Sequence, residues 1–519
     1  MDDKKQESAG IIMSGLFWVA CARVAQTLMQ FLVIVLLARL ISPADFGIVG
    51  AAMIVIGFSE IITELGLGAA IVQREELSEH HLSTGFSVSI VFALFSGTIV
   101  FLLAPYLAAF FGSPQIEPVL KVLALLFPLR GIGTIGEALA QRESRFRWLA
   151  IRDVFSFGAG YFVFGVVPAL LGYGVWALVA ANLATAALKT LLLLVSYPPK
   201  SLLFSRKAFR ELLSFGGGHT LARFANFSAR QGDNFIVGRF LGMTALGIYG
   251  RAYQLTGIPA TVMGQVIDKV LFPSIAKIQS QKPRLATLYL RGANLIATVT
   301  LPISVTGFII APEIVDVVLG VKWTAVVLPF RILLLGFMMR SSYKFSDLLA
   351  KSTGAVYRRA WRHGIYAAMV IGGGWIGHFW GVPGVAAGVL AAVAVNYLLM
   401  TQMSLSIVGK TWFDFAKVYL KPMILTATVL AFVYPTVYLL RNLGWPAEIL
   451  LAAILFLFAP LLFAVIRLAP QFFLGSDGIW MLKILGNYLP QGLRRIILPE
   501  NEMFSQRAIG VKDAGTENA

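Results

Sequence analysis

The chain of 519 residues has few of the groups on which enzyme chemistry depends. Its single cysteine, Cys21, excludes a disulfide framework and a cysteine-rich zinc or iron–sulfur site. Its five histidines form no His-x-x-x-His or His-Glu-x-x-His arrangement. The nearest match to a nucleotide-binding loop, SLSIVGKT at 404–411, has Ser404 where that loop requires glycine. We therefore expect no metal, no cofactor and no hydrolysis of ATP.

Charged residues are also scarce. They make up 13% of the chain, against roughly 25% in an ordinary soluble domain. Apolar residues make up 58%, and the mean hydropathy is +0.78. Because this leaves too little polar surface to cover a soluble globule, we predict an all-α polytopic membrane protein.

Long apolar runs divide the chain into predicted spans. A helix needs about 20 residues to cross the hydrocarbon core, and this rule gives about fourteen transmembrane helices. The predicted spans are 12–38, 45–72, 84–110, 117–140, 150–171, 174–196, 212–236, 244–273, 287–310, 322–346, 357–379, 382–406, 420–440 and 446–467.

The placement of basic residues predicts the orientation of these spans, since Lys and Arg are retained on the cytoplasmic side of short loops. With the N-terminus inside, 29 of the 43 Lys and Arg fall on the inner side and five on the outer side. Both termini are therefore expected in the cytoplasm. The net charge of +17 is then a topology signal spread over loops, and we expect no nucleic-acid partner.

An internal repeat appears at an offset of 200 residues. ARLISPADFGIVGAA at 38–52 aligns with GRFLGMTALGIYGRA at 238–252 without a gap. Six predicted spans separate the two copies, and an even number preserves direction across the membrane. We therefore predict two parallel-repeat six-helix lobes around a central cavity, followed by two C-terminal helices.

The predicted organisation follows from these spans and loops. An amphipathic pattern in the tail, with Trp480, Ile484 and Tyr488 on one helical face, indicates an interfacial helix. The segments are a cytoplasmic N-tail (1–11), an N-lobe (12–196), a cytoplasmic inter-lobe loop (197–211), a C-lobe (212–406), the last two spans with their preceding loop (407–467) and a cytoplasmic tail (468–519).

Ionisable residues within the predicted spans are candidates for a site, because a charge at membrane depth costs roughly 2.5–3.5 kcal/mol. Nine of these groups are cations and five are anions. Since ion pairing alone favours equal numbers, we expect some cations to face a watery cavity and await an anion. The candidate anion ligands are Arg23, Arg223, Arg130 and Arg331, and the candidate polar cavity residues are Gln26, Asn226 and Gln254.

Arg23 and Arg223 occupy equivalent positions in the two repeats, so we expect both to point toward one cavity. Guanidinium groups there offer bidentate hydrogen bonds to phosphate or carboxylate. The alternative is pairing within a lobe, with Arg23 bound to Glu60 or Glu64. These two carboxylates, four residues apart, would otherwise raise one another's proton affinity and serve ion coupling. Asp233 is interpreted as a member of a salt bridge rather than a cation site.

Several segments resemble the polysaccharide transporter family of bacterial flippases, the Wzx-like exporters. They are LARLISPADFGIVGAA, FSEIITELGLGAAIVQREELSEHHLSTGF, GVWALVA, and DNFIVGRFLGMTALGIYGRAYQLTGIP followed by VLFPSIAKIQ. The resemblance covers roughly residues 10–410, and it is most specific at 36–85 and 233–279. The family belongs to the superfamily that also contains multidrug antiporters and the lipid II flippase.

The resemblance implies a multi-pass protein of the bacterial inner membrane that is a transporter and not an enzyme. The implied substrate is undecaprenyl-pyrophosphate carrying an oligosaccharide repeat unit, for exopolysaccharide, capsule or O-antigen synthesis. Membrane lipids and a polysaccharide polymerase with its co-polymerase are the implied partners. The alternatives are a drug/cation antiporter, for which a net acidic cavity is expected, and a membrane polymerase or ligase, for which a longer outer loop is expected.

Overall fold

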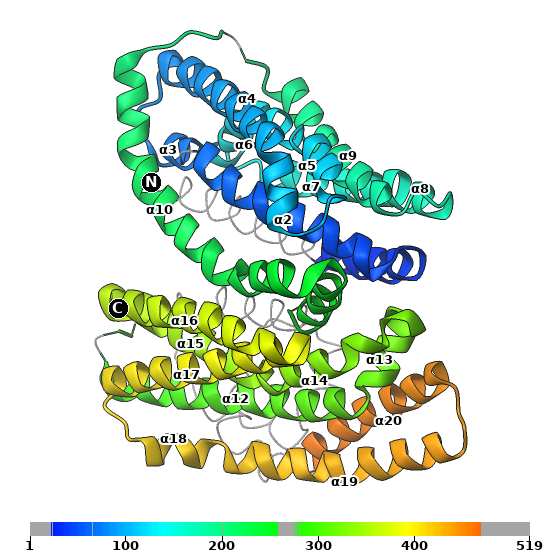
Figure 1. Cartoon of the computed structure of the whole chain (residues 1–519). Coiled ribbons are helices and arrows are strands. Elements are labelled where there is room, and N and C mark those ends of the chain that lie inside the picture. The colour runs from blue at the N-terminus through cyan, green and yellow to red at the C-terminus, as the bar shows by residue number, and fades with distance from the viewer. Residues whose placement is uncertain are drawn as a thin grey trace, which may run out of the picture. The chain divides into compact units, whose positions relative to one another are not determined.

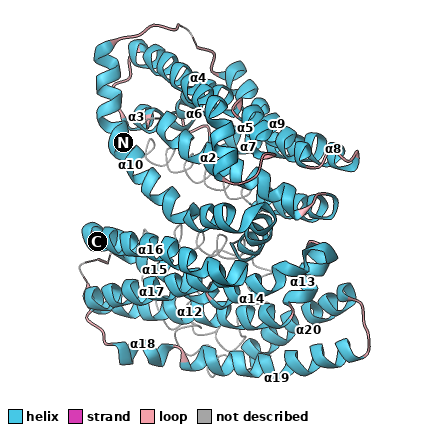
Figure 2. Cartoon of the chain, viewed as in Figure 1, coloured by secondary structure: helices cyan, strands magenta, loops and turns pink. Residues whose placement is uncertain are grey.

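The computed structural model describes residues 22, 24–64, 66–199, 201–257, 275, 278–279 and 281–468. Within these ranges the chain forms helices and connecting loops and no strand, as Figure 2 shows. The prediction of an all-helical protein is confirmed. The predicted tail with its interfacial helix lies outside the described residues, as do Cys21 and Arg23.

The described chain divides into two compact units. The first contains the described residues that fall within 1–258, 315–333 and 364–392, and the second contains those within 259–314, 334–363 and 393–468. The N-terminal elements, shown in blue to green in Figure 1, all belong to the first unit. They are the helix at 24–40, α2 (Pro43–Glu64), α3 (Leu67–Gln73), α4 (Glu79–Phe110), α5 (Ile116–Leu123), α6 (Leu126–Arg142), α7 (Phe146–Gly158), the π-helix η1 (Ala159–Val166), α8 (Val167–Leu170), α9 (Val175–Ser196), α10 (Arg206–Ile236), the π-helix η2 (Val237–Leu241) and the helix at 242–257.

The later elements alternate between the two units. They are α12 (Lys282–Ile309), α13 (Ala311–Val318), the 3₁₀-helix η3 (Val321–Val326), α14 (Val327–Leu335), α15 (Phe337–Ser352), α16 (Val356–Gly377), the 3₁₀-helix η4 (His378–Trp380), α17 (Gly381–Val408), α18 (Trp412–Val418), α19 (Leu420–Asn442) and α20 (Ala447–Leu468). The chain reverses between α16 and α17 at Gly381, whose φ of +69° is a left-handed conformation that glycine adopts at little cost.

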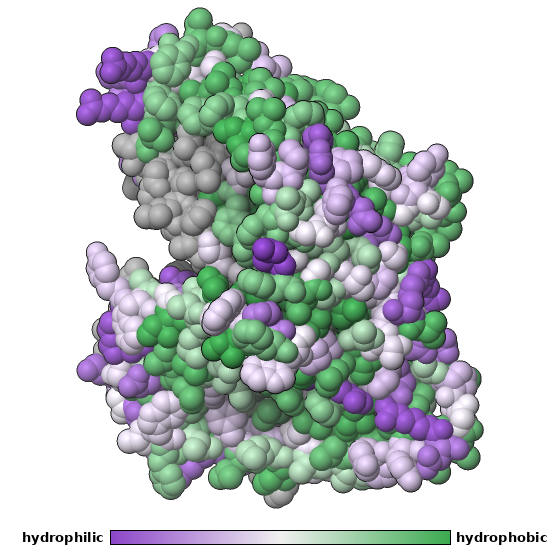
Figure 3. All heavy atoms as spheres, in the orientation of Figure 1, coloured by the Kyte–Doolittle hydropathy of each residue, from purple (hydrophilic) through white to green (hydrophobic). Residues whose placement is uncertain are grey.

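Eight helical segments in the described residues are long and apolar enough to cross a membrane, and a bent pair at 321–352 brings the number to nine. One of the eight, at 357–408, is 52 residues long and includes both α16 and α17. Large apolar side chains are exposed on many of these helices, and Figure 3 shows them as broad green areas. A surface of this kind is stable in lipid, so the chain is a multi-pass membrane protein.

The predicted count of fourteen spans remains a prediction. The predicted span at 212–236 corresponds to α10, which is helical but too polar to qualify as an apolar crossing. The predicted first span is described only from residue 22, and the part of its helix that the structure describes, 24–40, is too short to test a full crossing. Polar residues on α10 thus weaken the hydropathy signal of a helix that the chain nevertheless forms.

Candidate functional site

The first unit encloses a cavity of about 840 Å³, which we call the ionic cavity. It lies among α2, α3, α6, α7, η1, α9 and α10. Its charged lining consists of Glu60, Arg130, Glu137, Lys189 and Arg223. Uncharged polar side chains complete the polar part of the wall: Thr134, Gln141, Tyr161, Asn182, Thr185 and Thr190. So many polar groups inside helices with apolar outer faces indicate a water-filled space.

Arg130 and Glu60 form an ion pair across this cavity. The Arg130 Nη1 lies 2.7 Å from Glu60 Oε1 and 2.5 Å from Oε2. The Glu60 side chain is 19% exposed and that of Arg130 is 37% exposed, so both groups keep contact with the cavity. The pair uses one nitrogen of a guanidinium that carries five N–H donors. Arg130 therefore has the chemistry to hold a second anion beside Glu60.

A second network of charges lies where α6, α7 and α9 meet. Arg152 is buried and its Nη2 lies 2.7 Å from Asp153 Oδ1 and 3.4 Å from Glu137 Oε2. Lys189 Nζ lies 3.1 Å from the same Asp153 oxygen. Two carboxylates and two cations thus balance one another here. This network fixes the positions of Glu137 and Lys189 in the cavity wall.

The π-helix η1 brings its backbone close to α9 beside the cavity. A Cβ on Gly160 would lie 2.0 Å from Thr185 Oγ1, so only glycine permits this approach. Tyr161 follows directly, and its hydroxyl donates to Asn182 Oδ1 at 3.4 Å. The wide turn therefore sets the position of the tyrosine and asparagine that line the ionic cavity.

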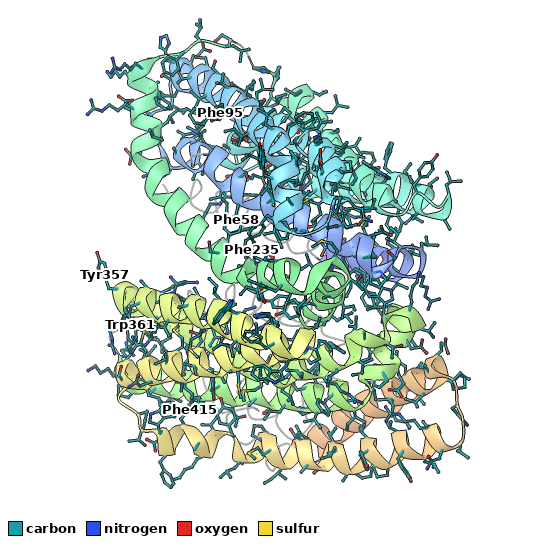
Figure 4. The ribbon with its side chains drawn as sticks, in the orientation of Figure 1. Phe58, Phe95, Phe235, Tyr357, Trp361 and Phe415 are labelled. Carbon is teal, nitrogen blue, oxygen red and sulfur yellow. The ribbon has the colours of Figure 1, made fainter. Side chains whose placement is uncertain are left out.

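A smaller cavity of about 380 Å³, which we call the junction cavity, shares Glu60 with the ionic cavity. Its walls come from α2, α10 and the helix at 242–257, and its polar lining is Glu60, Gln231, Asn234 and Arg251. Phe58, labelled in Figure 4, packs beside it with its ring 4.7 Å from that of Phe227. Glu60 is therefore the point at which two polar cavities in the first unit meet.

Arg251 is the cation of the junction cavity. Its guanidinium carbon lies 4.1 Å from the centre of the Phe46 ring, and its Nη1 donates to Gln254 Oε1. Its Nε is buried and makes no hydrogen bond within the described residues. A buried donor in this state is costly, and an anion or a water molecule in the cavity would satisfy it.

Two glycines allow the walls of the junction cavity to approach each other. A Cβ on Gly47 would lie 1.7 Å from the carbonyl oxygen of Met243, and one on Gly247 would lie 1.9 Å from that of Pro43. These glycines are aligned in the internal repeat, offset by 200 residues. The aligned helices thus pack backbone to backbone at equivalent positions, as small residues allow in membranes.

The structure brings three of the residues chosen from the sequence into one cavity: Glu60, Arg130 and Arg223. Among the described residues the partner of Glu60 is Arg130, and the predicted pairing of Glu60 with Arg23 lies outside the described residues. Arg223 lies half-buried on α10 and takes part in further interactions there. Arg23 and the side chains of Glu64 and Asn226 lie outside the described residues.

The remaining predicted residues lie elsewhere. Gln254 binds Arg251, and Asp233 is buried with its Oδ2 2.7 Å from the Tyr249 hydroxyl, which donates to it. Gln26 is half-buried on the helix at 24–40, and Arg331 is half-buried on α14. Neither of these two is among the residues that line the ionic or junction cavity in the described part of the chain.

Sequence reasoning passed over four residues of the site: Glu137, Lys189, Arg251 and Tyr161. The first three were visible as ionisable groups within predicted spans, but nothing in the sequence ranked them above similar groups. Tyr161 carried no signal, because its role depends on the π-turn of η1. Within the described ranges no three His, Cys, Asp or Glu side chains are grouped as they would be at a metal site.

A third polar cluster lies where α10 begins. Glu211 Oε2 lies 2.6 Å from Arg74 Nη2 and 2.9 Å from His81 Nε2. The backbone N–H of Ser78 donates to His81 Nδ1 at 3.2 Å, so the ring proton belongs on Nε2 and is donated to Glu211. The hydrogen bond from His81, together with the charge of Arg74, lowers the pKa of Glu211 below its ordinary value. The cluster ties α10 to α3 and α4.

The family model and the curated relatives that match this chain agree on one family. Residues 36–328 match the model of a family described as polysaccharide biosynthesis protein. The chain is 28% identical over 310 residues to the succinoglycan biosynthesis transport protein ExoT of Rhizobium meliloti, covering 59% of this chain and 62% of that protein. It is 26% identical over 333 residues to the lipopolysaccharide biosynthesis protein WzxC of Escherichia coli, covering 63% and 67%.

A third relative, the teichuronic acid biosynthesis protein TuaB of Bacillus subtilis, is 25% identical over 323 residues, which cover 61% of this chain and 66% of that protein. The matches thus span about two thirds of the relatives' length. Among solved structures, the lipid II flippase MurJ has a TM-score of 0.68 at 15% identity, covering 82% of this chain and 99% of MurJ. An inward-facing multidrug transporter has a TM-score of 0.57 at 16% identity, covering 74% and 95%. These two likenesses establish the fold.

Proposed function

The chain belongs to the polysaccharide biosynthesis protein family, and we propose that it moves a lipid-linked oligosaccharide across the membrane by alternating access. The observation that carries the proposal is the pair of polar cavities that meet at Glu60 inside helices with apolar outer faces. It acts as a transporter, without chemical conversion of its substrate. Two transporters of known structure share its fold.

The substrate that we propose is undecaprenyl-pyrophosphate bearing an oligosaccharide repeat unit. Its headgroup carries about two charges and many hydroxyls, and each unpaired polar group buried in hydrocarbon costs several kcal/mol. Spontaneous flipping is therefore negligible, and a hydrated cavity removes most of the barrier. Relatives of this chain are described as biosynthesis proteins for succinoglycan, lipopolysaccharide and teichuronic acid.

The charge of the cavities supports an anionic substrate. Four cations and two carboxylates line the ionic and junction cavities in the described residues: Arg130, Lys189, Arg223 and Arg251 against Glu60 and Glu137. Arginines hold pyrophosphate through bidentate, charge-assisted hydrogen bonds. We propose that Arg130 and Arg223 bind the pyrophosphate, together with Arg23 and Arg331, and that Gln26, Asn226 and Gln254 contact sugars. In this scheme Glu60 releases Arg130 to the incoming substrate, and Glu64 and Asp233 remain candidates for ion coupling or salt bridges.

The same proposal includes the finer architecture: fourteen spans, two parallel lobes at 12–196 and 212–406, and both termini in the cytoplasm of a bacterial inner-membrane protein. The reciprocal approach of Gly47 and Gly247 supports a two-fold relation between the repeats. Reporter fusions after Ser42, Gly112 and Leu319 should report an outside location, and fusions near Phe146 and Ala355 an inside one. A reversal of sign between the lobes would refute the parallel arrangement. A polymerase and a co-polymerase are the proposed protein partners.

A deletion strain tests the transport function directly. Loss of the protein should stop surface or secreted polysaccharide while lipid-linked repeat units accumulate on the cytoplasmic side, since their synthesis precedes flipping. Leaflet-specific labelling of the lipid-linked sugars measures this. Undiminished repeat units on the outer leaflet, in a strain without related transporters, would refute the flippase assignment. Units that reach the outer leaflet but stay unpolymerised would favour a polymerase instead.

A further inference from the structure

Basic side chains gather in the second unit where α15 passes into α16 and where α17 ends. Four of them, Lys351, Arg358, Arg359 and Arg362, form what we call the interfacial cluster. The Arg358 Nη2 donates to Ser406 Oγ at 2.6 Å, which ties the start of α16 to the end of α17. In Figure 1 the α15–α16 and α17–α18 connections lie at the same end of these helices.

A single carboxylate orients two members of the interfacial cluster. Lys351 Nζ lies 2.7 Å from Asp347 Oδ2, and Arg359 binds the same carboxylate through Nε and Nη2. The ring of His363 also contacts it, with Nε2 2.9 Å from Oδ1. The Asp347 side chain is only 13% exposed, because these partners surround it. Asp347 therefore fixes the positions of two cations but can neutralise only one of their charges.

The other two arginines are held by neutral groups. Arg362 is buried, and it donates from Nε to the Leu399 carbonyl oxygen at 3.1 Å and from Nη1 to that of Arg358 at 2.6 Å. Arg358 donates to the Ser406 hydroxyl. Carbonyl and hydroxyl acceptors satisfy N–H donors without cancelling the positive charge. In the described part of the chain the four cations of the cluster share one carboxylate, which leaves an excess of three positive charges.

Membrane topology alone does not require this arrangement. Basic residues that set the orientation of a span act through their charge in a loop and need no fixed partners. Here Arg362 is buried, Lys351 and Arg359 are held by Asp347, and Arg358 is held across two helices. Guanidinium groups fixed close together without matching carboxylates have the geometry of an anion site rather than of a solvated charge run.

Exposed aromatic rings surround the interfacial cluster. Tyr357 is 91% exposed and Trp361 is 50% exposed, and the two lie one turn apart on α16, as labelled in Figure 4. The Arg362 guanidinium lies 4.4 Å from the centre of the Trp361 ring. On α18, Lys417 Nζ lies 4.2 Å from the centre of the exposed Phe413 ring. Aromatic rings beside cations are typical of the headgroup level of a bilayer, where the anions are lipid phosphates.

We propose that the interfacial cluster binds the phosphate of an anionic phospholipid of the surrounding bilayer. Arginine forks match the phosphate oxygens, and an anionic headgroup offsets the excess positive charge, which a zwitterionic headgroup does not. The cluster belongs to the second unit, whereas the ionic and junction cavities belong to the first. The ligand is therefore a lipid of the membrane and not the transported substrate, and this inference does not rest on the proposed function.

Photo-crosslinking identifies the lipid beside the cluster. Benzoylphenylalanine replaces Tyr357 or, as a control, Tyr438, an exposed tyrosine of the same unit whose neighbour Arg441 is paired with Glu313 at 2.8 Å. The full chain is irradiated in nanodiscs of dioleoyl phosphatidylcholine and dioleoyl phosphatidylglycerol, with one lipid radiolabelled in each sample. Because the two lipids carry the same acyl chains, the ratio of phosphatidylglycerol to phosphatidylcholine labelling reports the headgroup. We expect this ratio to be several-fold higher at position 357 than at position 438.

Paired variants separate the cluster from general basicity. Arg358→Gln with Arg359→Gln should lower the ratio at position 357 to that at position 438. Lys282→Gln with Arg284→Gln also removes two exposed cations from the second unit, outside the cluster, and should leave the ratio unchanged.

A further variant tests the fixed geometry. Ser406→Ala keeps every charge but removes the anchor of Arg358, so it should lower the ratio in part, which attraction by charge alone would not do. Each protein is compared as a monodisperse peak with an unchanged Tm.

Three outcomes would overturn the proposal. The first is an equal labelling ratio at positions 357 and 438, or an equal loss in the two double variants. The second is displacement of phosphatidylglycerol by excess inorganic phosphate, which would identify a site for a soluble anion. The third is displacement by undecaprenyl phosphate added as a small fraction of the phosphatidylglycerol, which would identify an entry site for a polyprenyl substrate. Persistence of the labelling under both competitors is the expected result.

Discussion

The interiors of the two units satisfy their polar groups in different ways. In the second unit many of the interior polar groups are hydroxyls, and some of them bond within the protein: Thr298 and Thr300 donate to carbonyls four residues earlier, and Tyr289 and Ser346 lie 2.9 Å apart. Others, among them Ser304, Ser341 and Thr401, are buried without a hydrogen bond within the described residues. The Tyr289 ring also stacks on Phe345, with centres 5.6 Å apart. In the first unit, the interior carries guanidinium, ammonium and carboxylate groups around open space.

This difference distinguishes polar groups that serve packing, such as hydroxyls, from polar groups that can bind a ligand, such as guanidinium groups. A hydroxyl has one proton to donate, and the preceding turn of its own helix accepts it. A guanidinium has five donors, which one carboxylate cannot satisfy, so it needs water or an anion beside it. We therefore expect substitutions in the charged interior to change transport and substitutions in the hydroxyl-rich interior to change stability.

The largest expected effect follows removal of Arg130. Arg130→Ala takes one charge-assisted hydrogen-bond donor from the substrate, worth about 1.5–3 kcal/mol, which corresponds to about tenfold or more in transport rate. Arg130→Lys should keep part of the activity, since it retains charge but loses the planar fork. Export is measured as surface polysaccharide per cell at matched protein level.

Lys121 supplies a matched control for this substitution. Its side chain is 37% exposed, as that of Arg130 is, and it pairs with Glu117 at 2.7 Å on one face of α5. Such a helical pair contributes about 0.2–0.5 kcal/mol, so Lys121→Ala should change export by less than about threefold. Equal losses in the two variants would contradict the distinction between site and surface charges.

The second prediction concerns the glycines that bring α2 against the helix at 242–257. Gly47→Ala would place a Cβ 1.7 Å from the Met243 carbonyl oxygen, which the backbone can relieve only by moving apart. Overpacking of this kind costs about 1–3 kcal/mol. Thermal unfolding in detergent should show a lower Tm for Gly47→Ala and Gly247→Ala. Gly250→Ala, which meets no atom within 4 Å, should not share this loss of Tm.

Much of this site is accessible to sequence reasoning, for a physical reason. Because a charge at membrane depth is expensive, Glu60, Arg130 and Arg223 are conspicuous in an apolar chain. The repeat also identifies Gly47 and Gly247 as equivalent. Sequence alone carries no distance between helices, however, so the partner of Glu60, 70 residues away in Arg130, could not be selected from several arginines.

The fold likewise has parts that the sequence predicts and parts that only the structure explains. Helices with strong hydropathy, such as α4 and α9, coincide with predicted spans, and α10, which contains the predicted span at 212–236, forms despite a polar sequence. The polarity of α10 is explained by what surrounds it: Arg223 lines the ionic cavity, and Gln231 and Asn234 line the junction cavity. The glycines at 372–374 permit close helix packing, but which of them pack and which face open space depends on a helix rotation that only the structure provides.

A smaller effect is expected in the second unit. Tyr289→Phe removes the hydrogen bond to Ser346 and keeps the ring stacked on Phe345. Loss of such a bond costs about 0.5–1.5 kcal/mol, increased where the partner is left unsatisfied. We expect a slightly lower Tm and unchanged export at matched protein level. A loss of export as large as that of Arg130→Ala would remove the contrast between the two interiors.

The smallest expected effect concerns the pH dependence of the Glu211 cluster. The hydrogen bond from His81, with the charges of Arg74 and Lys207, lowers the pKa of Glu211 in the folded protein. A carboxyl whose pKa is lower when folded stabilises the fold above its ordinary pKa of 4.5, and this contribution is lost as the pH falls through the folded value. The side chain is 31% exposed, so solvent screens the interaction.

Thermal unfolding of the wild type and Glu211→Gln should therefore differ most near neutral pH and converge as the pH is lowered below 4.5. Glu448→Gln, in the exposed first turn of α20, serves as a control for the loss of a carboxylate outside the cluster. A difference between wild type and Glu211→Gln that stays constant from pH 7 to pH 3 would show that α10 is held to α3 and α4 by packing rather than by this charge cluster.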